Sequence, residues 1–227
     1  MLKPMVPCFI QKRDQVLISL STRNLDFIIE AKKVLSQLPG IAPNIPSIVC
    51  AGFPNVGKST LVKMVSTAEP EIAYYPFTTR KLIIGHLKVG NQKVQIVDTP
   101  GILDRPMSER NDIELQAVAA LKYLANVIIF MVDASETCGW TFNQQLNLLT
   151  EVQRMFPLNP LLVALNKVDI TPDSQLEIAR DRLPNAYEIV AINQIGVDQL
   201  LEDALEEVDL KSMQESIDDY LKTLSGE

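Results

Sequence analysis

The sequence has little of what a disulfide framework, a metal cluster or a membrane span would need. Its three cysteines are scattered at Cys8, Cys50 and Cys138, which fits neither disulfide pairing nor clustered metal ligands, so we expect a reducing cytoplasmic setting. The single histidine, His86, follows an apolar run and is expected to be structural rather than a ligand. No run of roughly eighteen apolar residues occurs, which predicts no membrane span. The first residues also lack the long apolar stretch of a secretion signal.

Charge is unevenly distributed along the 227-residue chain, whose formal net charge is −7. An acidic chain is repelled by polyanions, so we do not expect it to bind DNA or other nucleic acid non-specifically. Residues 1–45, however, hold six basic and three acidic residues, whereas residues 198–227 hold two basic and ten acidic residues. Both ends could be solvated helix surface, or the basic N-terminal face could turn towards RNA.

Periodicity divides the chain into an N-terminal helix and an alternating region. Over residues 11–38 apolar residues recur at helical spacing, and Pro39-Gly40 ends the predicted helix before a linker stiffened by Pro43 and Pro46. From residue 47 onwards, runs typical of strands alternate with helical patterns. The predicted strands are residues 47–51, 81–88, 93–97, 127–132, 161–165 and 189–192, and the predicted helices are residues 59–65, 111–124, 142–155, 173–182, 197–208 and 213–224.

This alternation predicts an α/β fold with a mainly parallel, doubly wound sheet that helices cover on both faces. A turn signal at residues 89–92 joins two of the strands as a hairpin, which would add one antiparallel edge strand. The helix over residues 11–38 cannot bury its own apolar stripe, so it must pack on this domain or on a partner.

A glycine-rich loop is predicted between the strand at residues 47–51 and the next helix. Because Gly52 and Gly57 have no Cβ, the backbone could wrap phosphate groups closely and present its N–H groups and a helix N-terminus to them. Lys58 would span the β- and γ-phosphates of a nucleotide, and the Ser59 hydroxyl would hold Mg²⁺. An ordinary glycine turn before a helix is the alternative. The predicted nucleotide contacts of this loop are Gly52, Phe53, Pro54, Asn55, Val56, Gly57, Lys58, Ser59 and Thr60.

Two further segments would sense a γ-phosphate. In the segment Asp98-Thr99-Pro100-Gly101, Asp98 would reach Mg²⁺ through water and the Gly101 N–H would meet the γ-phosphate. In Tyr75-Pro76-Phe77-Thr78-Thr79, Thr79 would supply the second hydroxyl to Mg²⁺, with Thr78 as the alternative, and Phe77 would lie at the nucleotide. Loss of the γ-phosphate would release both loops, which is a switch. The predicted catalytic residues are Lys58, Thr79 and Gly101, and the predicted metal ligands are Ser59, Thr79 and Asp98.

A fourth motif, Asn166-Lys167-Val168-Asp169, ends a predicted buried strand at the edge where such sheets bind ligands. Asp169 could accept hydrogen bonds from guanine N1–H and from its exocyclic amine, a pattern that adenine lacks. Asn166 would brace the neighbouring loops, and the stem of Lys167 would cover the base. The best match to the segment that supports guanine after the last strand is Val190-Ala191-Ile192, with the Ala191 N–H reaching the base oxygen.

The order of these motifs predicts a P-loop GTPase domain over residues 47–209 that binds GTP or GDP with Mg²⁺. It would be flanked by a helical segment and linker at residues 1–46 and an acidic tail helix at residues 210–227. Hydrolysis should be slow, because Ile102 stands where Ras-like enzymes carry a glutamine that orients water. The Asn55 carbonyl oxygen could hold K⁺ beside the phosphates, as in potassium-activated GTPases that this loop resembles, or Asn55 could only brace the loop.

These motifs resemble the Obg-like branch of translation-factor GTPases, and other segments resemble the nucleolar GTP-binding protein family in its archaeal form. Those segments are Pro70-Glu71-Ile72-Ala73, Gly85-His86, Asp104-Arg105-Pro106, Glu109-Arg110-Asn111, Ile113-Glu114 and Ser135-Glu136-Thr137-Cys138-Gly139. The resemblance runs from about Gln37 to Asp169. It implies a role in assembly of the large ribosomal subunit, with rRNA and ribosomal proteins as partners. It also implies a longer N-terminal helical domain, of which this chain matches the last helix.

Two other functions stay open at this point. The chain could be an Obg-like stress or translation regulator on mature ribosomes, or a nucleotide-gated binding module with negligible turnover. Measured turnover separates the module from an enzyme, and co-sedimentation with precursor or mature subunits separates the two ribosomal functions.

Overall fold

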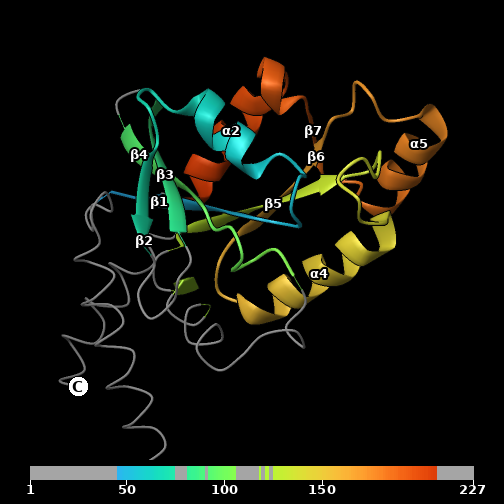
Figure 1. The fold of residues 1–227 in the computed structure, drawn as a ribbon, viewed down its shortest axis with the longest axis horizontal. Helices are drawn as coiled ribbons and strands as arrows, with labels where there is room; N and C mark the ends of the chain where they lie inside the picture. The colour runs from blue at the N-terminus through green and yellow to red at the C-terminus, as the bar shows by residue number, and fades with distance from the viewer. Residues whose placement is uncertain are drawn as a thin grey trace, which may run out of the picture.

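A seven-stranded sheet forms the centre of the fold in the computed structural model, which describes residues 45–74, 81–89, 92–105, 118, 121–122 and 125–208 (Figure 1). The strands lie in the order β2-β3-β4-β1-β5-β6-β7. Their bounds are β1 Ser47–Ala51, β2 Glu71–Tyr74, β3 Lys81–Val89, β4 Gln92–Asp98, β5 Val127–Asp133, β6 Leu161–Asn166 and β7 Tyr187–Ile189. The pairs from β4 to β7 are parallel, and β3 runs antiparallel to both β2 and β4.

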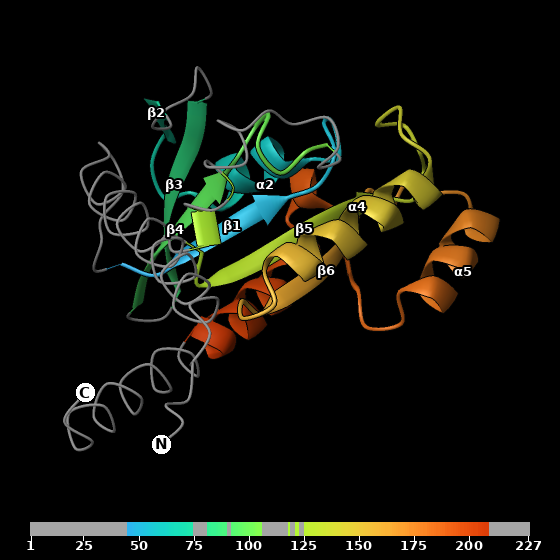
Figure 2. The ribbon, with the colours of Figure 1, turned by 90° about the horizontal axis from the view of Figure 1, so that it is seen from below.

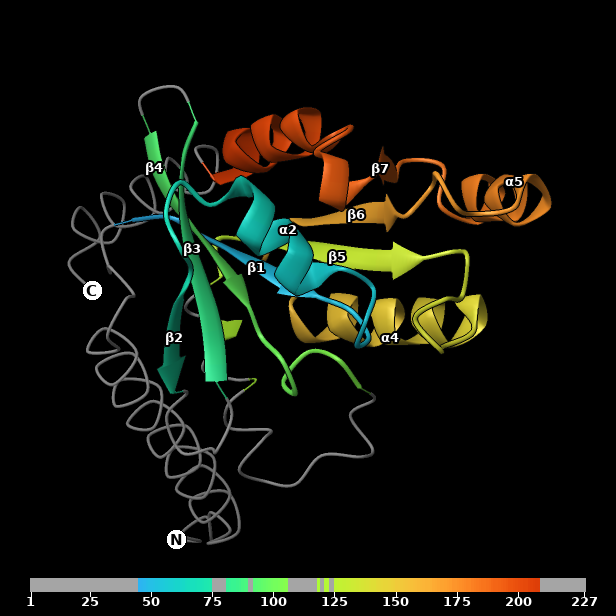
Figure 3. The same ribbon diagram turned by 45° about the horizontal axis from the view of Figure 1, so that its top comes forward.

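Helices cover both faces of the sheet. Their bounds are α2 Lys58–Val65, α4 Phe142–Met155 and α5 Asp173–Arg182, followed by the short 3₁₀ helix η2 Ala191–Asn193 and a helix at residues 197–208. α2 and the helix of residues 197–208 lie on one face and α4 lies on the other (Figure 3). Seen from below, α4 runs along β5, and α5 lies beyond the end of the sheet where β5 and β6 finish (Figure 2).

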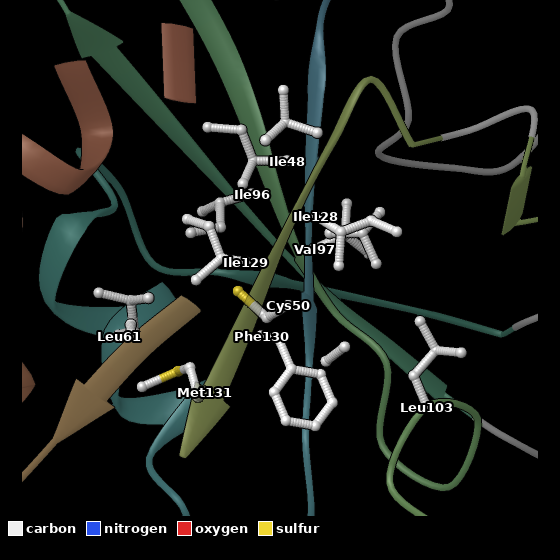
Figure 4. Close-up of a cluster of buried hydrophobic side chains, with 14 of the residues drawn as sticks. Ile48, Cys50, Leu61, Ile96, Val97, Leu103, Ile128, Ile129, Phe130 and Met131 are labelled. Carbon is white, nitrogen blue, oxygen red and sulfur yellow. The ribbon is translucent and has the colours of Figure 1, made fainter. Parts of the chain in front are cut away.

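The two central strands carry the core. Every residue of β1 and of β5 is buried, which is why both segments are almost continuous apolar runs rather than alternating ones. Figure 4 shows side chains of β1, β4 and β5 packed together, with Leu61 of α2 and Leu103 against them. Because these neighbouring central strands are parallel, their C-terminal ends lie together, and the loops that follow them meet at one edge of the sheet.

The beginning of α4 is set by its sequence. The Thr141 Oγ1 accepts a hydrogen bond from the Gln144 N–H at 3.3 Å, and the Gln144 Oε1 accepts one from the Thr141 N–H at 2.9 Å. This reciprocal pair satisfies two of the backbone donors that a helix leaves without partners in its first turn. It also fixes the C-terminal end of the loop that connects β5 to α4.

The predicted α/β fold with a mainly parallel sheet is confirmed, and β3 is the predicted antiparallel strand. β2 was not predicted, and because it pairs with β3 it forms the edge of the sheet in place of the hairpin. The apolar pattern of β2 does not predict a strand, because Ile72 and Tyr74 are exposed and only Ala73 is buried. The strand predicted at residues 189–192 was partly wrong, because β7 ends at Ile189 and a 3₁₀ helix follows.

Some predicted elements lie outside the described residues. These are the helices at residues 11–38 and 213–224, the segment of residues 75–80, and most of the helix at residues 111–124, of which residues 118, 121 and 122 are helical. Within the described part of the chain, no helix has the length and apolar character needed to cross a membrane.

Candidate functional site

The loops that follow β1, β4, β5 and β6 meet at one edge of the sheet. Parallel strands end together, and the register places Cys50 beside Asp98 and Asp133 beside Asn166. The loops after β1 and β6, the start of α2 and residues 190–192 line a pocket of about 510 Å³ at this edge. Its lining residues are Asn55, Gly57, Lys58, Ser59, Thr60, Asn166, Lys167, Asp169, Ile170, Val190, Ala191 and Ile192.

Two positions in the loop after β1 require glycine. Gly52 has φ 128° and Gly57 has φ 111°, conformations that other residues rarely adopt. A Cβ on Gly52 would overlap the Met131 carbonyl oxygen, and one on Gly57 would overlap the Asn166 Nδ2. The loop therefore approaches β5 and the end of β6 more closely than any side chain would allow.

Lys58 lies folded back over this loop. Its side chain is only 6% exposed, and its ammonium donates hydrogen bonds to the carbonyl oxygens of Gly52 and Phe53, both at 2.9 Å. Carbonyl dipoles thus compensate a buried positive charge, and no carboxylate of the described residues is hydrogen-bonded to it. The ammonium remains available to a nearby anion as a charge-assisted donor.

Ser59 and Asp98 form a polar pair at the start of α2. The Ser59 hydroxyl donates to Asp98 Oδ2, while among the residues that the structure describes the buried Oδ1 of Asp98 has no hydrogen-bond partner. Burial raises the pKa of the Asp98 carboxyl against the lowering effects of Lys58 and Ser59, and the charge of Asp104 adds to the rise. A buried carboxylate oxygen without a partner is costly.

A hard cation would remove that cost. Hydroxyl and carboxylate oxygens are the ligands that Mg²⁺ prefers, and Mg²⁺ usually takes one or two protein oxygens and completes its shell with phosphates and water. The described residues hold no group of three or more His, Cys, Asp or Glu side chains that could bind a metal. The donor set therefore fits Mg²⁺ that arrives with a phosphate ligand rather than a metal bound by the protein alone.

The loop after β4 is tied to the loop after β1. The Gly52 N–H donates to the Leu103 carbonyl oxygen at 3.0 Å, and both Ile102 and Leu103 are buried. Gly101 has φ 76°, and its N–H donates to Asp104 Oδ2 at 2.6 Å. The sequence marked Asp104 only as part of a segment that resembles the family and predicted no role for it at the site, because its contact is a local turn within one loop.

Asn166 connects three loops, as predicted. Its Nδ2 donates to the Val56 carbonyl oxygen at 2.8 Å, and its Oδ1 accepts from the Ala191 N–H at 2.9 Å. The expectation that the Ala191 N–H meets a base oxygen conflicts with this geometry, since that donor is already engaged. The next backbone N–H, that of Ile192, has no hydrogen bond among the described residues, and Ile192 is one of the residues that line the same pocket.

Lys167 lies at the wall of the pocket with its ammonium turned aside. Its φ of 63° is left-handed, and its Nζ donates to Asp133 Oδ2 at 2.6 Å and to Thr137 Oγ1 at 3.0 Å. Lys167 lines the pocket together with Asp169, whereas its charged end is held by Asp133 and Thr137, which do not line it. Ile170 and Ile192, which are 56% and 64% exposed, add apolar surface to the same walls.

Asp133 organises the loop after β5, and sequence reasoning missed it. Besides Lys167, its carboxylate accepts from the Ser135 N–H and Oγ at 3.0 and 2.5 Å, from Thr137 Oγ1 at 2.9 Å and from the Cys138 N–H at 2.9 Å. Burial raises the pKa of this carboxyl, but the hydrogen bonds from Lys167, Ser135 and Thr137 outweigh it and hold the pKa below its usual value. An acidic residue directly after a buried apolar strand was the available clue.

An aromatic pair links this loop to the loop after β1. The rings of Phe53 and Trp140 stack with centroids 4.2 Å apart and planes 20° from parallel. Because Phe53 is a buried residue of the glycine-rich loop, this stacking places Trp140 against that loop. Residues 134–141 therefore contact both the Lys167 side chain and the glycine-rich loop.

Three predicted site residues, Phe77, Thr78 and Thr79, lie outside the described residues. The structure brings Ser59 and Asp98 of the predicted phosphate end into direct contact, and the charge of Lys58 is near enough to lower the pKa of Asp98 against the effect of burial. It brings those of the base end, Asn166, Lys167 and Asp169, to one pocket with residues 190–192.

Comparison with known proteins identifies the class first. The G domain of the FeoB iron transporter of T. maritima superposes with a TM-score of 0.60 at 21% identity, covering 72% of this chain and 99% of that one. This likeness shows the fold, which with the strand order and the glycine-rich loop is that of a P-loop GTPase domain.

The family follows from closer relatives. A Plasmodium falciparum protein assigned as nucleolar GTP-binding protein 1 has a crystal structure that matches with a TM-score of 0.67 at 31% identity, covering 83% of this chain and 99% of that one. The model of the nucleolar GTP-binding protein 1 family matches residues 112–169. This chain belongs to the nucleolar GTP-binding protein 1 family.

Full-length relatives are longer than this chain. The uncharacterised protein MJ1408 of Methanocaldococcus jannaschii is 48% identical over 151 residues, which is 66% of this chain and 41% of that protein. Nucleolar GTP-binding protein 1 of Caenorhabditis elegans is 41% identical over 160 residues, which is 70% of this chain and 24% of that protein. The chain thus matches less than half the length of these curated relatives.

Proposed function

We propose that this chain binds guanine nucleotides with Mg²⁺ and acts as a slow GTP-hydrolysing switch in assembly of the large ribosomal subunit. The proposed binding of guanine nucleotides rests on the two hydrogen bonds of the Asn166 side chain. They join the glycine-rich loop to residues 190–192 across one pocket. That pocket has a cationic, N–H-rich end at Lys58 and an acidic end at Asp169. A nucleoside diphosphate or triphosphate has the matching order of groups.

At the phosphate end, the loop N–H groups and Lys58 would bind the β- and γ-phosphates. Lys58 would exchange its two carbonyl acceptors for phosphate oxygens, which as charged acceptors form stronger hydrogen bonds. Ser59 and Asp98 would hold Mg²⁺, and Thr79 remains the proposed second hydroxyl. When bound, the metal neutralises phosphate charge.

At the base end, the Asp169 carboxylate would accept from guanine N1–H and the exocyclic amine. The Ile192 N–H takes the place that we first expected for Ala191, as the donor to the base oxygen. The stem of Lys167 and the exposed side chains of Ile170 and Ile192 would pack against the faces of the base. The base would thereby cover apolar surface that is otherwise exposed to water.

The protein carries its own probe for this binding. Trp140 is the single tryptophan of the chain and stacks on Phe53 of the glycine-rich loop. We expect its fluorescence to change when GDP or a GTP analogue is added with Mg²⁺, and not when ADP is added at the same concentration. The Lys58→Ala variant should lose most of the response. Equal responses to ADP and GDP would contradict the guanine assignment.

Hydrolysis by the isolated chain should be slow, because Ile102 can neither donate to nor accept from an attacking water and its side chain is buried. We expect a single-turnover rate near or below about 10⁻² s⁻¹. The measurement should be made in KCl and in NaCl at equal ionic strength, which tests whether Asn55 supports a K⁺ ion. Fast turnover without a partner would contradict this prediction, and turnover indistinguishable from buffer would favour a nucleotide-gated binding module.

The proposed role in ribosome assembly is supported by the nucleolar names of the relatives and by the excess of basic residues in residues 1–45. We propose that this protein acts in the cytoplasm. Co-sedimentation with precursor and mature large subunits, in a GTP analogue and in GDP, tests the role in assembly. Charge reversal at Lys32 and Lys33 shows whether this segment contributes phosphate contacts. Binding to mature ribosomes alone would favour a translation regulator instead.

A further inference from the structure

Asp104 occupies the backbone donor that the proposed function assigns to the γ-phosphate of GTP. Its Oδ2 accepts the hydrogen bond of the Gly101 N–H at 2.6 Å, which is short for a bond from a backbone amide. Carboxylate acceptors form stronger bonds of this kind than neutral ones. In this arrangement, the Gly101 N–H already has an anionic acceptor within the protein.

The backbone between Gly101 and Asp104 is held in place. Leu103, one residue before Asp104, accepts from the Gly52 N–H at 3.0 Å and is fully buried. Ile102 is also buried, with 2% of its surface exposed. Asp104 itself is half-buried. The side chain of Asp104 is therefore the part of this segment that can turn towards water while the backbone stays.

A phosphate oxygen and the Asp104 carboxylate compete for one hydrogen. Both are anions, so close approach of the two is unfavourable in a partly desolvated site. An incoming γ-phosphate must displace Asp104, whereas a diphosphate need not.

We propose that Asp104 determines how strongly the site prefers GDP over GTP, by acting as an internal substitute for the γ-phosphate at the Gly101 N–H. This inference rests on the proposed function. Without a γ-phosphate, Asp104 holds the loop of residues 99–104 in the arrangement seen here. With GTP, the γ-phosphate takes the N–H and the carboxylate leaves, so the loop changes its surface with the nucleotide.

The test compares the affinities of wild type, Asp104→Ala and Asp104→Asn for GDP and for a β,γ-imido analogue of GTP, by competition with a fluorescent nucleotide in Mg²⁺. Removing the competing acceptor should raise the affinity for the analogue by about tenfold. The affinity for GDP should stay within about twofold. Asp104→Asn keeps an uncharged acceptor, so it should lie between wild type and Asp104→Ala. Asp181→Ala, an exposed aspartate on α5, is the matched control and should leave the ratio unchanged.

Each outcome decides the matter. An unchanged ratio of the affinity for GDP to the affinity for the analogue would show that Asp104 only shapes the loop. Equal losses of affinity for both nucleotides would show the same, and either result overturns the inference. An unchanged ratio with slower hydrolysis would instead assign Asp104 to the attacking water. If Asp104→Ala does not fold, the ratio in Asp104→Asn decides alone. A wild type that binds no guanine nucleotide would overturn the proposed function and this inference together, whereas GDP binding with an unchanged ratio overturns only this one.

Discussion

Replacing Asp169 by asparagine should transfer the nucleotide preference from guanine to xanthine. The carboxylate of Asp169 lines the base end of the pocket, where it would accept from two donors of guanine. Asparagine puts an amide donor against one of those donors, and xanthine presents a carbonyl oxygen there instead of an amine. A buried donor left without an acceptor costs on the order of 3 kcal/mol, which corresponds to roughly a 150-fold change in affinity.

Competition of GDP, XDP and ADP with a fluorescent nucleotide measures this directly. Asp173→Asn is the matched control, since Asp173 is an exposed carboxylate in the first turn of α5, four residues along the chain. It should keep the wild-type order of affinities. If Asp169→Asn also keeps full preference for GDP, the base lies elsewhere and the assignment of the pocket is wrong.

What the sequence predicted well depends on local constraints. The glycines at 52 and 57 mark positions where the backbone approaches β5 and Asn166 too closely for a Cβ, and such positions leave a fixed spacing in the sequence. The buried strands β1 and β5 appear as apolar runs because both faces of each are covered. These features are visible in one segment at a time.

What the sequence did not reveal depends on contacts between distant segments or on turns without a spacing rule. The role of Asp133 arises from Lys167, which lies 34 residues away in the chain. The use of the Ala191 N–H by Asn166 depends on how a 3₁₀ helix, rather than a strand, follows β7. β2 carries exposed apolar residues because it lies at the edge of the sheet, so its pattern does not resemble that of a half-buried strand.

Replacing Asp133 by asparagine should produce the largest loss of stability among the carboxylates described above. Both oxygens of Asp133 accept hydrogen bonds, so an amide nitrogen in either orientation would face donors from the loop after β5. Losing one partner of a buried ion pair costs about 3–5 kcal/mol. Because Lys167 is 24% exposed and can turn to water, we expect the lower end, about 3 kcal/mol in the free energy of unfolding.

Urea and thermal unfolding of the nucleotide-free protein measure this loss, which should lower the melting temperature by about 6–12 °C for a chain of this size. The matched control is Glu188→Gln, which makes the same change in an ion pair of the same length, 2.6 Å, between exposed side chains. It should cost less than about 1 kcal/mol. Equal losses of unfolding free energy in the two variants would show that the burial of Asp133 adds nothing to the stabilising effect of its ion pair.

The pH dependence supplies a second check on Asp133. Its pKa is lowered in the folded state, so its contribution is fully present above the pKa of an unfolded aspartate, about 3.9, and is lost as the pH falls through the lower folded value. The difference in unfolding free energy between wild type and Asp133→Asn should therefore be constant near neutral pH and shrink below about pH 4. A difference that stays constant down to the acid transition would assign the loss to the shape of the amide rather than to the charge of the carboxylate.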